Sequence, residues 1–253
     1  MIMAKLRLRV ASQPGVPGYK PESVEAGSVF SIAIVTEGCK EELIYLRHIK
    51  ALCEKRGSSA THTKINFVND EYVSPKAAES ESNPLHRLNA LLEHLGVTNP
   101  DFKEFRTDEA WLVCDRDDGS FTEAQYDDVL KLCGQHHIRW VVSNPAFQLW
   151  LLFHFTDALV ILGLEECRTS VDRKVRIEAE LKKYVDDYRH GTLNVFEYEE
   201  NIEDAVVNSR KFCTDLSRLK YDVGTNFADL VDSLRKRFGV DVFAYGPSGD
   251  VLD

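Results

Sequence analysis

The stretch AWLVCDRDDGS (residues 110–120) carries a run of apolar residues directly into a cluster of carboxylates, Asp115, Asp117 and Asp118. Like charges lie this close together mainly where a cation lies between them. If the preceding strand stays extended to its tip, Asp115 and Asp117 are two residues apart and share a face, while Arg116 points away. We therefore expect Asp115 and Asp117 to be ligands of a divalent cation.

A second carboxylate follows another apolar run, where VFSIAIV (29–35) leads through Thr36 into Glu37 and Gly38. In a parallel sheet, ligands bind beyond the carboxyl ends of the strands, so Glu37 is expected near the two aspartates. An all-oxygen site of high negative charge suits Mg²⁺, with Mn²⁺ as a substitute. Glu37 could hold the metal or act as a general acid or base.

Three polar residues near the same edge of the sheet are candidate substrate contacts. Lys40 stands near the start of the next helix and could meet an anion there, with an exposed helix lysine as the alternative. Ser143 and Asn144 follow a fourth strand and precede Pro145, an arrangement that also fits a helix cap and first helical residue.

The elements that position these residues alternate between strand and helix. Apolar β-branched runs predict strands, and apolar residues at helical spacing predict helices. The strands are expected at 29–35, 64–69, 109–115 and 138–143, and the helices within 39–57, 83–96, 122–135 and 145–155. This alternation indicates an α/β fold with a mostly parallel sheet flanked by helices.

After about residue 165 the strand signal fades, and three helical patterns follow at roughly 168–189, 199–219 and 224–238. We therefore expect a peripheral segment over 1–28, an α/β domain over 29–160 and a helical C-terminal region over 165–253.

Composition narrows the class of protein. The 253 residues carry a net charge of −10, which argues against coating nucleic acid with the whole surface, although Lys and Arg gather late in the chain. The six cysteines are scattered without a C-x-x-C pair, as is typical of reduced thiols in a cytoplasm. No apolar run is long enough for a membrane span, and the N-terminus lacks the pattern of a signal peptide.

Three segments carry a resemblance to known proteins. IAIVTEGCKEELIYL and WLVCDRDD resemble the two acidic motifs of the Toprim fold. Together with SNPAFQLWLLFHF they resemble the RloB-like family of bacterial defence islands, over about residues 30–155. The resemblance implies a Toprim-like nuclease fold in which Glu37 is the general acid/base and Asp115 and Asp117 bind Mg²⁺. It also places Ser143, Asn144, Phe147, Trp150 and His154 in the motif of the fourth strand.

In function, the resemblance implies cleavage of nucleic acid, either RNA or tRNA or DNA, in antiviral defence. A partner ATPase of a defence system and a homo-oligomer are candidate assemblies.

Two departures from the family pattern leave alternatives open. Gln148 stands where the family commonly has glutamate, and a later Gly-Tyr and Lys pattern is only loosely echoed by Tyr184, Tyr188 and His190. Gln148 favours a non-catalytic sensor that binds nucleic acid, a nucleotide or a defence protein.

A second alternative is a phosphatase like the haloacid dehalogenases. Asp115 would then be the nucleophile and Asp117 the acid/base, although that fold usually places this loop on its first strand.

The apolar residues of the segment 145–155 also have a simpler interpretation. Helical spacing predicts that Phe147, Trp150, Leu151 and Phe155 belong to the core, and that His154 is a hydrogen-bonded structural residue.

Overall fold

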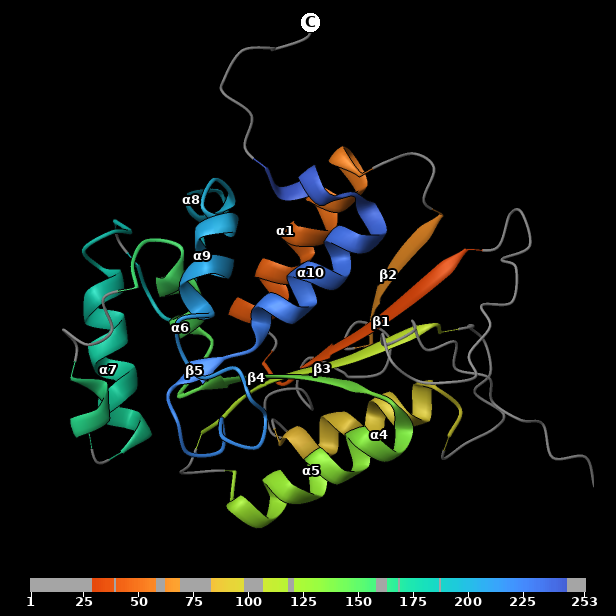
Figure 1. Ribbon diagram of the computed structural model, residues 1–253, viewed down its shortest axis with the longest axis horizontal. Helices are drawn as coiled ribbons and strands as arrows, with labels where there is room; N and C mark the ends of the chain where they lie inside the picture. Colours follow the sequence, from red (N-terminus) through yellow and green to blue (C-terminus); the bar gives the residue numbers. More distant parts are fainter. Residues whose placement is uncertain are drawn as a thin grey trace, which may run out of the picture. The chain divides into compact units, whose positions relative to one another are not determined.

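The computed structural model describes residues 29–38, 40–57, 62–68, 83–97, 107–117, 121–157, 163–167, 169–186 and 188–244. The predicted peripheral segment 1–28 and Asp118 lie outside these ranges. Within them the strands form one sheet in the order β2-β1-β3-β4-β5, and helices follow its strands along the chain (Figure 1). The strands are β1 (Phe30–Thr36), β2 (Thr63–Phe67), β3 (Glu109–Asp115), β4 (Arg139–Asn144) and β5 (Gly224–Thr225). The predicted α/β class is confirmed.

The helices follow the strands in the predicted alternation and then dominate the C-terminal part. They are α1 (Glu41–Arg56), α4 (Pro84–His94), α5 (Glu123–His136), α6 (Gln148–Phe153), α7 (Ser170–Leu181), α8 (Phe196–Glu199), α9 (Ile202–Ser209) and α10 (Phe227–Phe238). Two short 3₁₀ turns, η3 (Leu164–Glu166) and η4 (Val240–Phe243), complete the described elements. None of the helices in these ranges is both long and apolar enough to cross a membrane.

The chain divides into two compact units. The first contains Met1–Cys39, Ser59–Cys114 and Ser120–Val141, and the second contains Lys40–Ser58, Asp115–Gly119 and Val142–Asp253. Thus β1, β2, α4 and α5 belong to the first unit, and α1, α6 to α10 and β5 belong to the second.

In the first unit, β1 pairs in parallel with both β2 and β3. Residues Ser31 to Thr36 of β1 are all buried, as expected for a strand covered on both faces. Helices α4 and α5 lie side by side (Figure 1). The Asn83 side chain caps α4 by accepting a hydrogen bond from the Leu85 N–H at 2.8 Å.

In the second unit, α6 is buried along its whole length and packs against α7 and α9. Its Trp150 ring stacks on Phe227 of α10, with ring centroids 4.7 Å apart. Tyr45 of α1 meets both rings edge-on. Phe147 and Leu151 are also buried, so the core interpretation holds for them and for Trp150, whereas Phe155 lies after the helix and is only partly buried.

Several boundaries in the second unit differ from the prediction: the helix expected over 168–189 ends at Leu181, and the one expected over 224–238 begins at Phe227. The helix expected over 145–155 is shorter, because α6 begins only at Gln148 after the turn at Pro145. The helix expected over 199–219 ends at Ser209, and the two-residue strand β5 follows, paired antiparallel with β4. Gly224 also forms a bridge with Cys213, and only glycine fits there, since a Cβ atom would lie 2.0 Å from the Cys213 carbonyl oxygen.

Candidate active site

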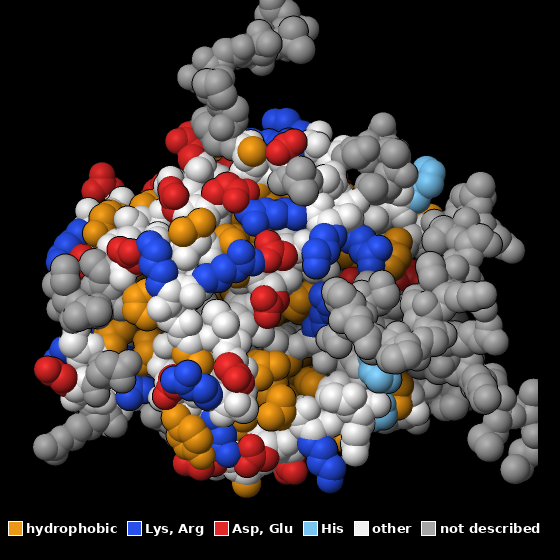
Figure 2. Space-filling view, in the orientation of Figure 1, with side chains coloured by type: hydrophobic (Ala, Val, Ile, Leu, Met, Phe, Trp, Pro, Cys, Tyr) orange, Lys and Arg blue, Asp and Glu red, His pale blue; other side chains and the backbone are white. Residues whose placement is uncertain are grey.

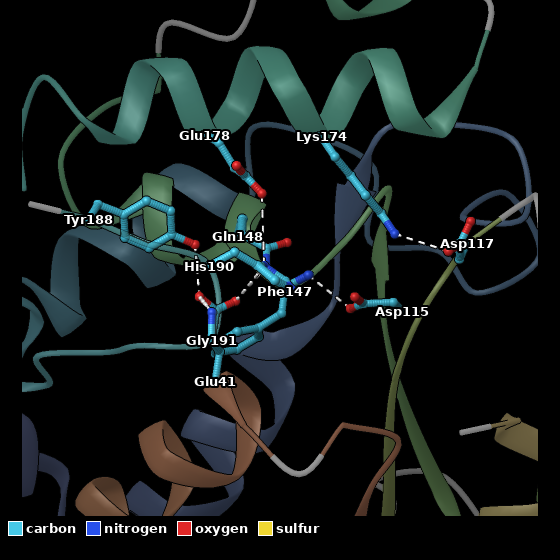
Figure 3. A network of polar contacts seen from close by, with 10 residues as sticks. All are labelled: Glu41, Asp115, Asp117, Phe147, Gln148, Lys174, Glu178, Tyr188, His190 and Gly191. Carbon is cyan, nitrogen blue, oxygen red and sulfur yellow. Dashed lines mark hydrogen bonds and ion pairs between the residues drawn. The ribbon is translucent and has the colours of Figure 1, made fainter. Parts of the chain in front are cut away.

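The two aspartates at the tip of β3 lie in the second unit and contact different partners (Figure 3). Asp115 Oδ1 accepts a hydrogen bond from the Phe147 backbone N–H at 2.8 Å. Asp117 lies 3.1 Å from the Lys174 ammonium group. The side chain between them, Arg116, is only 4% exposed and donates to the Lys220 carbonyl oxygen. β3 ends at Asp115, so the shared face expected of Asp115 and Asp117 stays a prediction.

The end of β4, which precedes Phe147 in the chain, is hydrogen-bonded to residues late in the sequence. Asn226 Oδ1 accepts from the Val142 N–H at 2.8 Å, and the Ser143 and Thr225 hydroxyls are 2.9 Å apart. The Asn144 amide donates to the Leu219 carbonyl oxygen at 2.8 Å. The side chains of Ser143 and Asn144 are thus buried and bonded within the second unit, and their contact with substrate stays a prediction.

Helix α7 brings two side chains to Asp117. Thr169 caps the helix by accepting from the Asp172 N–H at 3.1 Å. Ser170 and Lys174, four residues apart, share one face of the helix. The Ser170 hydroxyl donates to Asp117 Oδ1 at 3.3 Å, while the Lys174 ammonium binds Oδ2. The side chains of Lys174 and Asp117 are 27% and 34% exposed, so solutes can reach this pair.

A buried carboxylate lies in the same neighbourhood, at the first turn of α1. Glu41 is 3% exposed, and it accepts hydrogen bonds from the Gln148 amide, the Tyr188 hydroxyl at 2.9 Å and the Gly191 N–H at 3.1 Å. A buried charge is costly unless it is paired or hydrogen-bonded in this way, and a helix N-terminus favours a negative charge. Nothing in our reading of the sequence singled out Glu41.

Gln148 uses both hydrogens of its amide nitrogen. One goes to Glu41, and the other goes to His190 Nδ1, which lies 3.0 Å away. His190 Nδ1 is also 3.6 Å from Glu41 and 3.8 Å from Glu178 of α7, while the His190 side chain is 67% exposed. The family pattern commonly has a carboxylate at position 148, and this chain has an amide there. The carboxylate next to that position belongs to Glu41 instead.

A second acidic residue of α1, Glu42, is 9% exposed. Burial raises the pKa of Glu42, and the neighbouring Glu41 carboxylate adds to the rise, while a backbone hydrogen bond, His190 and Lys174 oppose it. Glu42 is therefore biased toward holding a proton, which is the state that a general acid requires.

Lys40 and Glu37 occupy different units. Lys40 is exposed at the start of α1, and a Cβ atom on Gly191 would lie 3.2 Å from its Cδ, so the Lys40 side chain runs along the loop that binds Glu41. Glu37 follows β1 in the first unit, and its backbone N–H donates to the Val113 carbonyl oxygen of β3 at 2.8 Å. The strand order reverses at β1, where ligands commonly bind in open α/β sheets. The expected partnership of Glu37 with Asp115 and Asp117 stays a prediction.

His154 has a structural role, as its spacing predicts. It is 2% exposed, Nδ1–H donates to the Trp150 carbonyl oxygen at 3.0 Å, and Nε2 accepts from the Tyr45 hydroxyl at 2.9 Å. Burial lowers the pKa of His154 to about 3, so the ring is neutral. Both ring nitrogens are therefore engaged within the core.

The fit of Mg²⁺ to these residues depends on how many ligands the protein must supply. In the part of the chain that the structure describes, no three His, Cys, Asp or Glu side chains are grouped as a metal cage requires. Mg²⁺, however, is usually bound by one or two carboxylates, and waters and substrate phosphates complete its shell. Asp115 and Asp117 have the oxygen donors for that mode of binding.

A family model described as RloB-like protein matches residues 32–234 of this chain. No curated protein and no solved structure matches it.

Proposed function

The chain belongs to the RloB-like family, whose model covers residues 32–234, and on this basis we propose that it is a Mg²⁺-dependent nuclease with a Toprim-like fold. Its substrate would be a phosphodiester bond of RNA, tRNA or DNA, and its setting bacterial antiviral defence in the cytoplasm. The pair of aspartates at the tip of β3 is the observation that carries the proposal.

Asp115 and Asp117 are the residues that would hold the metal. The Phe147 N–H orients Asp115, and the Ser170 hydroxyl orients Asp117, so both carboxylates are positioned before any ion arrives. When bound, Mg²⁺ supplies positive charge that stabilises the phosphoryl oxygens during cleavage. Orientation in advance lowers the reorganisation needed when charge develops on the substrate.

Phosphodiester hydrolysis also needs a base for the attacking water and an acid for the leaving oxygen. Glu37 is the candidate from the sequence motif. His190 is a second candidate in the second unit, since its side chain is 67% exposed. The buried Glu42, whose pKa is raised, is a further candidate for the proton donor.

The distribution of charge bears on how substrate binds. On the face shown in Figure 2, Lys and Arg side chains are interspersed with Asp and Glu. With a net charge of −10, affinity for nucleic acid then depends on a few local cations and on the metal. Binding to a partner ATPase or to a second copy of the chain, which the family context suggests, would add further contacts to the nucleic acid.

A cleavage assay tests the proposal. The purified chain is incubated with labelled tRNA, single-stranded RNA and plasmid DNA, with Mg²⁺, with Mn²⁺ and with EDTA. Asp115→Asn keeps an oxygen acceptor for the Phe147 N–H but removes the charge that a cation needs. Asp128→Asn, at an exposed carboxylate of α5, is the matched control.

We expect metal-dependent cleavage of one substrate class, lost in Asp115→Asn and retained in Asp128→Asn. Cleavage that persists in EDTA would contradict the proposal. An intact fold that binds Mg²⁺ or nucleic acid but cleaves none of the three substrates would favour the sensor instead.

A further inference from the structure

Helix α7 contributes two neighbouring cations on its first turns, and their partners differ. The Arg173 guanidinium donates to the Leu164 carbonyl oxygen at 3.2 Å and so binds the η3 turn. Lys174 instead reaches Asp117, at 3.1 Å. Lys174 is therefore directed at the strand tip, while Arg173 holds a turn of the backbone.

The Lys174 ammonium occupies a position that a metal ion would need. Together with the Ser170 hydroxyl it engages both oxygens of Asp117. A divalent cation bound to Asp117 would displace a monovalent ammonium from the same oxygen, since its charge is larger and like charges repel. The ion pair is partly exposed, and such pairs are weak, so displacement is readily reversible.

Displacement needs only a rotation of the lysine side chain. The backbone of α7 is fixed by the Thr169 cap, by buried Ser170 and by Ile177 and Leu181, which are both 0% exposed. The freed ammonium would remain within a side-chain length of Asp117. A phosphate coordinated to the metal brings new anionic oxygens into that same space, and lysine binds phosphate as a compact point charge.

We propose that Lys174 is a phosphate-binding residue. Asp117 forms an ion pair with its ammonium group until a divalent cation binds Asp117 and releases the lysine. The inference rests on the proposed function and specifies how substrate is recognised there. The cation and the nucleic acid then bind cooperatively, because each stabilises the arrangement in which Lys174 has left Asp117. The coupling is reciprocal: nucleic acid raises the affinity for the metal by the same factor by which the metal raises the affinity for nucleic acid.

The test compares the wild type with Lys174→Gln and Arg173→Gln, which remove the same charge from adjacent positions of one helix. Isothermal titration calorimetry measures Mg²⁺ affinity without substrate. We expect Lys174→Gln to bind Mg²⁺ about two- to fivefold more tightly, because it removes a competing cation from Asp117. Arg173→Gln should stay within about twofold of the wild type, because Arg173 does not touch Asp117.

Fluorescence anisotropy then measures binding of a labelled single-stranded RNA and a labelled DNA duplex, with Ca²⁺ in place of Mg²⁺ to suppress cleavage. In the wild type, Ca²⁺ should raise the affinity for one of the two by at least about fivefold, within the usual range of coupling. In Lys174→Gln this enhancement should shrink, while Arg173→Gln should keep it.

Unchanged Mg²⁺ affinity in Lys174→Gln would overturn the inference, and so would tighter Mg²⁺ binding with undiminished enhancement by Ca²⁺. A wild type that binds Mg²⁺ but cleaves no substrate contradicts the proposed nuclease function. The calorimetric comparison of the variants still tests the role of Lys174 in that case. A wild type that cleaves while Lys174→Gln binds Mg²⁺ as before contradicts the role of Lys174 alone.

Discussion

Replacing Gln148 with glutamate tests how strongly the second unit depends on the amide at this position. Both hydrogens of its nitrogen are used, one by the Glu41 carboxylate and one by His190. Gln148→Glu keeps the shape of the side chain but removes both donors and sets a negative charge against Glu41. We expect the folded state to be destabilised at neutral pH.

Burial sets the size of the effect. Glu41 and Gln148 are each 3% exposed, so water does little to screen them. A lost hydrogen bond to a charged group costs about 1.5–3 kcal/mol, and two unit charges about 4 Å apart repel by about 4 kcal/mol at an effective dielectric constant of about 20. The contributions are not additive, because Tyr188 and Gly191 still bind Glu41 and the new carboxyl can take up a proton. We expect a loss of about 2–4 kcal/mol in the free energy of unfolding at pH 7.

The loss depends on pH with a definite sign. Burial and the Glu41 carboxylate raise the pKa of the introduced carboxyl above its unfolded value of about 4.3. Below that value the carboxyl is protonated in both states, so its charge adds no penalty. As the pH rises through the higher folded-state value, the penalty grows. The variant should therefore be closest to the wild type near pH 4 and furthest from it at neutral pH.

Urea denaturation followed by circular dichroism, at about pH 4 and pH 7, measures both quantities. Gln148→Met is the control, because it removes the donors without adding charge and should lose stability with no added dependence on pH. Equal losses for the two variants at both pH values would refute the electrostatic reasoning. Combining Gln148→Glu with His190→Lys should recover less than about 1 kcal/mol, because the His190 side chain is two-thirds exposed.

Three further predictions concern single contacts of the second unit. Burial lowers the pKa of His154 to about 3, well below its unfolded value of about 6.5, so acid destabilises the fold as the pH drops below about 6.5. In urea titrations between about pH 7 and 4, His154→Asn should remove that part of the acid sensitivity. Tyr188→Phe deletes the 2.9 Å hydrogen bond to buried Glu41 and should lower the free energy of unfolding by about 1.5–3 kcal/mol in the same assay. Gly224→Ala places a Cβ 2.0 Å from the Cys213 carbonyl oxygen, so thermal denaturation should show a loss of about 1–3 kcal/mol or more.

Each of these three variants has a matched control variant elsewhere in the chain. His137→Asn changes an exposed histidine in the left-handed region, which asparagine tolerates, and should leave the acid sensitivity in place. Tyr184→Phe removes a hydroxyl from a ring that is 45% exposed, and should cost less than about 0.5 kcal/mol. Gly134→Ala, on α5 with no atom within 4 Å of the new Cβ, should be neutral or stabilising. Equal losses within any pair would contradict the structural reason given for it.

Local patterns in the sequence were sufficient to predict the elements that carry the two aspartates. The expected strand 109–115 coincides with β3, so Asp115 ends the strand as predicted and Asp117 follows it. The Asn83 cap of α4 and the Gly57 end of α1 are likewise local signals. Such features depend on neighbours within a few residues, so no tertiary information is needed to predict them.

The surroundings of Glu41 depend on residues far along the chain. Its partners Gln148, Tyr188 and Gly191 lie 107, 147 and 150 residues away in sequence. No periodicity links such positions. One signal in the sequence could have located these partners. It is the short segment around His190, which contains a tyrosine, a histidine and a glycine and which loosely matches a later part of the family pattern.

The strand β5 was missed for a different reason. It consists of two residues, too few to show the alternation by which a strand is predicted. Its partners in the sheet, Ser143 and Asn144, lie about 80 residues earlier in the chain, so no local pattern reveals the pairing.

The stacking of Trp150 on Phe227 has a spectroscopic consequence. Of the three tryptophans, Trp111 and Trp140 belong to the first unit, and Trp150 alone belongs to the second. Replacing the first two with phenylalanine leaves a single buried emitter, whose fluorescence follows the aromatic core of the second unit. The complementary variant, with Trp150 replaced, follows the first unit. The chain thus carries its own optical probes for deciding whether its two units melt together or one after the other.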